Sequence, residues 1–146
     1  MFSHLLIPTD GSPLSSAAVK RGVELAKQMN AKVTGLHVAE PFRVLGTESE
    51  VLKDTREEYY ACARANAEEV LAAFETDAKS AGVSAFDRIF VVSDHPYEAI
   101  IDTARDKGCD LIVMASHGRR GLQALLLGSE THKVLVHSKI PVLVYR

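Results

Sequence analysis

Five short apolar runs, separated by segments with helical periodicity, most strongly limit the folds open to this chain. The runs are HLLIPT, KVTGLHV, RIFVVS, DLIVMA and IPVLVYR, and several are nearly continuous in Val, Ile and Leu. Strands buried on both faces have this composition, whereas half-exposed strands alternate apolar and polar residues. The runs therefore predict strands of a sheet that is covered on both faces.

The segments between the runs predict four helices. Apolar positions recur with helical spacing over 18–29, and Ser12 and Pro13 suit the N-cap and the first helical position. A long segment rich in Ala and Glu, from about 48 to 81, predicts a second helix that Gly82 ends. A third helix is predicted after SDHP, and a fourth follows the fourth strand. Positions of the fourth are Leu127, Thr131, Val134 and Leu135.

This alternation of strands and helices predicts the fold class. Each crossover returns the chain to the same end of the sheet, which favours parallel strands with helices on both faces. We therefore predict an α/β fold of Rossmann-like type, with a doubly wound five-stranded parallel sheet. A length of 146 residues, 47% of them hydrophobic, suits a single domain over residues 1–146. The segment 39–50, which contains Pro41 and Gly46, is predicted to be a loop.

Charge, hydropathy and cysteine content narrow the function classes. A net charge of −2 argues against a general nucleic-acid binder, so any phosphate recognition must be local. The apolar runs are short and the N-terminus lacks a signal-peptide pattern, so we expect a cytoplasmic protein without a membrane partner. Cys62 and Cys109 lack CxxC spacing and fit reduced thiols. No His, Cys and Asp cluster has zinc-ligand spacing, so no protein-bound metal is expected.

The stretch MASHGRRGLQALLLGSE, residues 114–130, leaves the fourth predicted strand with glycines and two arginines. Glycines let backbone amides approach an anion, and the next helix begins with unsatisfied N–H groups. Arg119 adds positive charge, and Ser129 adds a hydroxyl. Asp10 follows the first strand and offers an acceptor for ribose hydroxyls or an adenine amino group. A nucleotide satisfies both ends if the first and fourth strands are neighbours, which the sequence alone does not decide.

A purely structural interpretation of the same residues stays open. Gly118 and Gly121 also suit a simple turn after a strand, and Asp10 suits the turn before the first helix. Ser129 and His132 lie one helical turn apart, but nothing in the sequence supplies a third group or an oxyanion hole. We therefore expect no catalytic residue. His4 and His37, in strand-like positions, are predicted to be structural, while Pro8 and Val38 also suit strand-end packing.

The loop after the fourth strand also resembles a family motif. Neither GxxxxGK[ST] nor GxGxxG is present. The segment Ala115-Ser116-His117-Gly118, nine further residues and Gly128-Ser129 instead resembles the pattern G-x2-G-x9-G-[ST] of nucleotide-binding universal stress proteins. Ala115 stands in place of the first glycine. Similar stretches include LLIPTDGS, LHV, HPYEAIIDTA and SKIPVLVYR, so the resemblance covers essentially the whole chain.

The resemblance implies the strand order 3-2-1-4-5 and an adenine nucleotide at the strand ends. The ligand would be ATP with Mg²⁺, or else AMP or ADP. The matching positions near adenine and ribose are Pro8, Asp10 and Val38. Those of the phosphate loop are Ala115, Gly118, Gly128, Ser129 and Glu130. The methyl group of Ala115 implies weaker binding rather than none. A homodimer through the C-terminal strand is also implied, and the apolar edge of that strand invites pairing.

These features together predict an ATP-binding, dimeric regulatory module of the stress response. Two alternatives stay open. The first is a slow ATP hydrolase or nucleotidyl-handling enzyme that uses Ser129 and Mg²⁺, although the sequence does not identify a general base. The second is a dimeric interaction module that has lost nucleotide binding, with Ala115 as the first sign of the loss.

Overall fold

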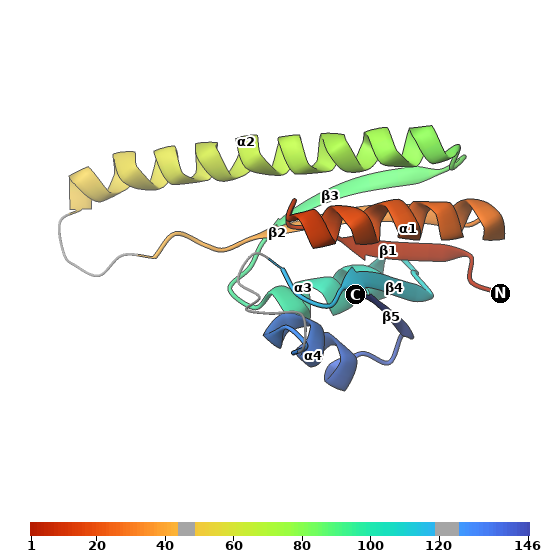
Figure 1. Ribbon diagram of the computed structural model, residues 1–146. Coiled ribbons are helices and arrows are strands. Elements are labelled where there is room, and N and C mark those ends of the chain that lie inside the picture. The colour runs from red at the N-terminus through yellow and green to blue at the C-terminus, as the bar shows by residue number, and fades with distance from the viewer. Residues whose placement is uncertain (44–48, 119–125) are drawn as a thin grey trace.

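The computed structural model describes residues 1–43, 49–118 and 126–146 of the chain (Figure 1). Strands and helices alternate along these residues, as the apolar runs predict. The strands are β1 (His4–Pro8), β2 (Lys32–Ala39), β3 (Phe86–Val92), β4 (Leu111–Ala115) and β5 (Val142–Tyr145). The helices are α1 (Pro13–Met29), α2 (Ser49–Ala81), α3 (Pro96–Asp106) and α4 (Ser129–His137).

The strands form one parallel sheet in the order β3-β2-β1-β4-β5. β1 lies at its centre, where Leu5 pairs with Val33 of β2 on one side and with Leu111 of β4 on the other. Figure 1 shows α1 and α2 on one face of the sheet and α3 and α4 on the other. The doubly wound α/β fold and the strand order 3-2-1-4-5 are therefore confirmed.

Two apolar cores hold the helices to the sheet, one on each face. Successive side chains of a strand point to opposite faces. Leu5 and Ile7 of β1 therefore enter the core with α1 and α2, whereas Leu6 enters the core with α3 and α4. All three side chains are fully buried. The continuous apolar run of β1 thus reflects a strand that is covered on both faces.

Local residues decide where the first two helices begin and end. Ser12 caps α1 by accepting a 3.3 Å hydrogen bond from the backbone N–H of Ser15. Pro13 takes the first helical position, as predicted. Gly82 follows the last residue of α2 with φ of +75°, a conformation that glycine adopts without steric cost. The predicted end of this helix is confirmed.

α2 begins at Ser49, close to the predicted start at about 48, and its first two residues fall inside the segment 39–50 that was predicted to be a loop. The beginning of α4 differs from the sequence-based expectation. Leu127 precedes α4 instead of belonging to it, because Gly128 has extended backbone angles and the helix begins at Ser129. Leu135, one of the positions whose spacing predicted this helix, is 41% exposed. Helical spacing does not distinguish the first turn of a helix from the loop before it.

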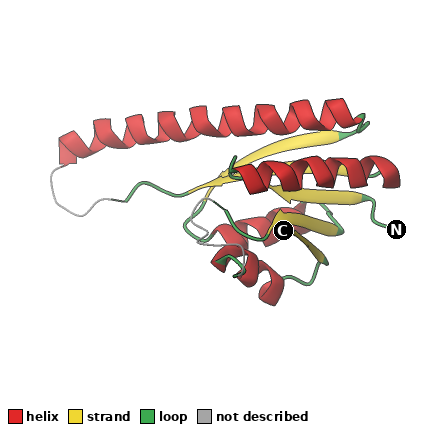
Figure 2. Cartoon of the chain, viewed as in Figure 1, coloured by secondary structure: helices red, strands yellow, loops and turns green. Residues whose placement is uncertain are grey.

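Helix α2 extends past the end of the sheet over its first part (Figure 2). Residues 53–58, all charged except Thr55, are exposed there, whereas Phe74, further along the helix, is buried in the core. The hydroxyl of Tyr59 donates a 2.7 Å hydrogen bond to the carbonyl of Glu40, which fastens the chain after β2 to the helix. Within residues 1–43, 49–118 and 126–146, no helix has the length and apolar character needed to cross a membrane.

Both cysteines are free thiols, as their spacing predicts. Cys62 is exposed on α2, and Cys109 is buried just before β4. Burial raises the pKa of the Cys109 thiol to about 11, so this thiol is neutral at physiological pH.

A polar network closes the amino end of the sheet. Nε2 of His4 lies 2.8 Å from Oγ1 of Thr34 in a buried hydrogen bond. The Asp110 carboxylate accepts hydrogen bonds of 2.8 Å and 2.9 Å from the backbone N–H groups of Ser3 and His4. Burial, and then the charge of Lys32, lower the pKa of His4. The structural role predicted for His4 is confirmed.

We predict that Gly35→Ala destabilises the fold through the ring of Phe74. A Cβ at position 35 would lie 2.5 to 2.7 Å from three atoms of this ring, which is 1% exposed and cannot move away freely. Overpacking of this kind costs about 1–3 kcal/mol of unfolding free energy. Urea unfolding measures the loss. A double-mutant cycle with Phe74→Leu is the control, because the cost of Gly35→Ala should shrink once the ring is gone. Equal costs in both backgrounds would contradict the explanation.

We also predict that His4 contributes to loss of stability at mildly acidic pH. Because its pKa is lower in the folded state than the ordinary value of 6.5, the unfolded state binds the proton more readily. The contribution of neutral His4 to the free energy of unfolding is therefore complete above pH 6.5 and declines as the pH falls below that value. Urea unfolding at about pH 7.5 and about pH 5.5 should show a steeper decline for the wild type than for His4→Gln. Parallel declines would contradict this role.

Candidate functional site

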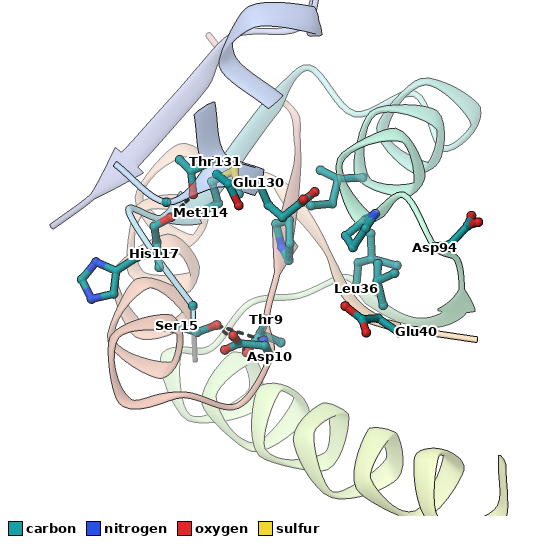
Figure 3. Close-up of a pocket in the computed structure, with 18 residues that line it drawn as sticks. Thr9, Asp10, Ser15, Leu36, Glu40, Asp94, Met114, His117, Glu130 and Thr131 are labelled. Atoms are coloured by element: carbon teal, nitrogen blue, oxygen red, sulfur yellow. Dashed lines mark hydrogen bonds between the residues drawn. The ribbon is translucent and has the colours of Figure 1, made fainter. Parts of the chain in front are cut away.

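The predicted site residues gather at the carboxyl ends of the strands. β1 and β4 are neighbours there, yet the chain leaves β1 for α1 on one face and β4 for α4 on the other. Such a reversal opens a crevice in which α/β proteins bind ligands. A cavity of about 380 Å³ lies at this position (Figure 3). Its volume is that of a small-molecule site.

A network of backbone groups and hydroxyls fixes the segment after β1. The N–H of Thr9 donates a 2.8 Å hydrogen bond to the carbonyl of Leu36. The Thr9 carbonyl accepts a 2.9 Å hydrogen bond from Nδ1 of buried His37, whose predicted structural role is confirmed. Oγ of Ser15 donates to Oγ1 of Thr9 at 2.9 Å and accepts from the N–H of Asp10 at 3.2 Å. Figure 3 shows Thr9, Asp10 and Ser15 together at one side of the cavity.

The Asp10 carboxylate lies directly against Gly118. Oδ1 of Asp10 accepts a 2.9 Å hydrogen bond from the N–H of Ser12, which holds the carboxylate in a turn before α1. A Cβ on Gly118 would overlap Oδ2 of Asp10, so any side chain at position 118 must displace the carboxylate. The ends of β1 and β4 thus bring the two predicted residues into contact.

Gly128 brings the end of the loop back against its beginning. Its N–H donates a 2.7 Å hydrogen bond to the carbonyl of Ser116. A Cβ at position 128 would lie 3.0 Å from Cα of His117 and 3.1 Å from the Ser116 carbonyl oxygen. The φ of −60° is open to any residue, so close backbone approach, and not φ, disfavours a side chain here. As the N-cap of α4, Gly128 offers no side chain to the first N–H groups of the helix, which suit an anion.

Ala115 ends β4 at the wall of the cavity. It is 7% exposed, and its carbonyl accepts a 2.9 Å hydrogen bond from Oγ1 of Thr131 in α4. Among the described residues other than glycine, only Asn30 has a positive φ. Ala115 therefore replaces the first glycine of the motif without backbone strain, and its methyl group acts only through the space it fills.

Glu130 lines the cavity, but its carboxylate has partners within the protein. Oε2 accepts a 2.9 Å hydrogen bond from the backbone N–H of Tyr97, in the first turn of α3. Oε1 accepts a 3.1 Å hydrogen bond from Nζ of Lys133. The carboxylate is thus held between α3 and α4. The group of Glu130 that suits an anion is its backbone N–H.

The remaining walls of the cavity are apolar on one part and acidic on another. The apolar side chains of the lining include Pro8, Leu36, Val38, Ile100 and Met114. Glu40 follows β2 and Asp94 follows β3, and Figure 3 shows both on the side opposite His117. Apolar walls suit a planar base, and carboxylates suit hydroxyl or amino donors. The cavity thus has carboxylates on the side of β2 and β3 and the first N–H groups of a helix on the side of α4.

Every predicted site residue in the described part of the chain lines this one cavity. These residues are Pro8, Asp10, Val38, Ala115, Gly118, Gly128, Ser129 and Glu130. Arg119 lies outside the described residues. The geometry brings the predicted residues together, and their contact with a ligand stays a prediction.

Several lining residues were not singled out from the sequence as ligand-site residues. They are Thr9, Ser15, Leu36, Glu40, Asp94, Pro96, Ile100, Met114, His117 and Thr131. Glu40 and Asp94 follow strands just as Asp10 does, so the common edge of a parallel sheet was an available signal for both. Ile100, Met114 and Thr131 carried no such signal. Their spacing predicts core positions, and the same side chains also reach the cavity.

The fold and the cavity define a class: small doubly wound α/β proteins with a ligand crevice where the strand order reverses. The family model of the universal stress proteins matches residues 1–146, and the chain belongs to this family.

Individual relatives agree with this assignment. The chain is 31% identical to universal stress protein MJ0531 of Methanocaldococcus jannaschii over 154 residues, which cover 100% of this chain and 83% of the relative. The solved structure of MJ0577, from the same organism, superposes with a TM-score of 0.82 at 30% identity, over 99% of this chain and 95% of that chain. A universal stress protein solved in complex with cAMP has a TM-score of 0.74 and 29% identity, over 99% of this chain and 97% of that chain.

Proposed function

We propose that this protein is an ATP-binding regulatory module of the stress response, with AMP and ADP as alternative ligands. It acts in the cytoplasm as a single domain over residues 1–146. One observation carries the proposal: the N-terminus of α4, with no side-chain cap from Gly128, borders a cavity in which Asp10 lies against Gly118. A helix N-terminus favours phosphate, and a carboxylate accepts hydrogen bonds from ribose hydroxyls.

The charges around the cavity support one orientation of the nucleotide. Glu40 and Asp94 carry negative charge near the ends of β2 and β3, where phosphate would be repelled. The phosphates are therefore expected at α4, with Mg²⁺ bound to them and the exposed hydroxyl of Ser129 beside them. The base and ribose then lie toward Pro8 and Val38.

The relative solved with cAMP supports an adenine nucleotide as the ligand class. The choice among ATP, ADP and AMP depends on the phosphate side of the cavity, where Ala115 replaces a glycine of the motif. Its methyl group occupies space at the wall, so we expect weaker binding of ATP than in a chain with glycine at this position.

We further propose a homodimer through β5. This strand is at one edge of the sheet, and Leu143 at its centre is 40% exposed. Val136 on α4 adds a further apolar side chain, 61% exposed. An uncovered apolar edge strand invites pairing with a second strand.

We expect Leu143→Asp to yield a monomer, because a charge would have to be buried in the interface. Sedimentation equilibrium measures the mass in solution. Val92→Asp is the matched control, since Val92 is also 40% exposed but lies on the opposite edge strand, β3. The wild type and this control should remain dimeric. A monomeric wild type, or a dimeric Leu143→Asp variant, would reject the β5 interface.

Nucleotide binding is tested by calorimetric titration with ATP and Mg²⁺, beside AMP, adenosine and GTP. The wild type should bind ATP saturably and in preference to GTP. Gly118→Val should weaken ATP binding by about tenfold or more, because the new side chain displaces the Asp10 carboxylate and fills the cavity. Asp10→Ala should weaken adenosine and ATP alike, since the carboxylate is expected at the ribose.

Two comparisons make this test specific. Ala65→Val enlarges an exposed position on α2, far along the chain from the cavity residues, and should leave the affinity unchanged. Ala115→Gly restores the glycine of the motif and should strengthen ATP binding. An absence of ATP binding by the wild type would reject the proposal, as would full affinity in a folded Gly118→Val variant.

A further inference from the structure

The hydrogen bond between Glu130 and Tyr97 joins the beginnings of two helices. Glu130 is the second residue of α4, and Tyr97 is the second residue of α3. Oε2 of Glu130 accepts the backbone N–H of Tyr97 at 2.9 Å, across 33 residues of sequence. His95, the N-cap of α3, makes no side-chain capping bond, and Pro96 has no N–H to offer. The carboxylate of α4 therefore supplies the cap of α3.

The same carboxylate has a second possible position, at the N-terminus of its own helix. An acidic side chain in the first turn of a helix is attracted by the partial positive charge of the free N–H groups there. Gly128 places no side chain in competition for these groups. A Glu130 carboxylate released from Tyr97 would therefore be drawn to the N–H groups proposed to receive phosphate.

Contacts on α3 and α4 hold the carboxylate in the first of these positions. Nζ of Lys133 lies 3.1 Å from Oε1 of Glu130 and 5.5 Å from the centre of the Tyr97 ring. The Tyr97 ring also packs against the ring of His137, with 5.3 Å between their centres. The position of Glu130 thus depends on how the first turn of α3 packs against α4.

We propose that Glu130 is an internal competitor for the anion site at the N-terminus of α4, and that its bond to α3 keeps this site open. This regulation rests on the proposed function, because it acts on the same phosphate position. A change in packing that separates the first turn of α3 from α4 releases the carboxylate and so lowers nucleotide affinity. Such a change would act at the surface formed by Tyr97, Lys133 and His137.

Three substitutions of Glu130 separate its hydrogen bond from its charge. Glu130→Gln keeps an acceptor of the same length and removes the charge. Glu130→Asp keeps the charge on a side chain that is too short to reach Tyr97. Glu130→Ala removes both. The probes are AMP, which carries a phosphate, and adenosine, which does not, each titrated calorimetrically.

We expect the Asp variant to bind AMP about two- to fivefold more weakly than the Ala variant, since only the Asp variant retains a competing charge. The Gln variant should bind AMP at least as tightly as the wild type. Adenosine should bind the Asp and Ala variants equally. Asp106→Asn is the matched control for net charge, because this exposed residue lies about 13 Å along α3 from Tyr97. It should leave AMP affinity unchanged, because solvent screens a charge at that distance.

Hydrogen exchange of the Tyr97 amide tests the bond itself, with or without a ligand. The amide should be protected in the wild type and the Gln variant, and it should exchange faster in the Asp and Ala variants. Protection that survives in the Ala variant would reject the bond and the proposal.

The outcomes also separate this proposal from the proposed function. Equal AMP affinity of the Asp and Ala variants would reject competition, although the nucleotide site would stand. Gln and Ala variants that both bind AMP more weakly than the wild type would show that the carboxylate acts on the ligand directly, which also rejects competition. An absence of AMP binding by the wild type, with Tyr97 protected by Glu130, would reject the nucleotide site and leave Glu130 as a cap only.

Discussion

The parallel pairing of β1 with β4 is the contact on which the site depends. Leu5 and Leu6 of β1 pair with Leu111 and Ile112 of β4, although more than a hundred residues separate them. Because the chain leaves these two strands toward opposite faces, their carboxyl ends border an open crevice. The apolar cores on both faces hold the pair in place, so the stability of the sheet also sets the geometry of the cavity.

Close packing, more than backbone conformation, explains the glycines of the loop. Gly118 leaves room for the carboxylate of Asp10, and Gly128 leaves room for the backbone of residues 116–117. The first contact joins the segments that follow β1 and β4, and the second joins the two ends of one loop. A methyl group would overlap the Asp10 carboxylate in the first and crowd the backbone in the second. The loop ends are therefore drawn together beside the N-terminus of α4. The positions proposed for phosphate and ribose then lie within one small cavity.

The charges near the cavity are positioned as much by backbone groups as by other side chains. Ser12 donates its backbone N–H to Asp10, and Tyr97 donates its backbone N–H to Glu130. Hydrogen bonds of this kind hold a carboxylate in one orientation. In the first case the carboxylate faces the cavity, and in the second it is turned toward a neighbouring helix. These backbone hydrogen bonds thus set where each of the two carboxylates lies relative to the cavity.

The sequence by itself determined the elements, the fold class and the segments that carry the site. Those signals are local, since apolar runs, Ser12, Pro13 and Gly82 act on the residues around them. The beginning of α4 and the exposure of Leu135 escaped this reasoning. Only the tertiary structure decided that Asp10 touches Gly118 and that Glu130 caps α3. Such contacts join residues far apart in the chain, and they follow from strand pairing and helix packing, which no local pattern encodes.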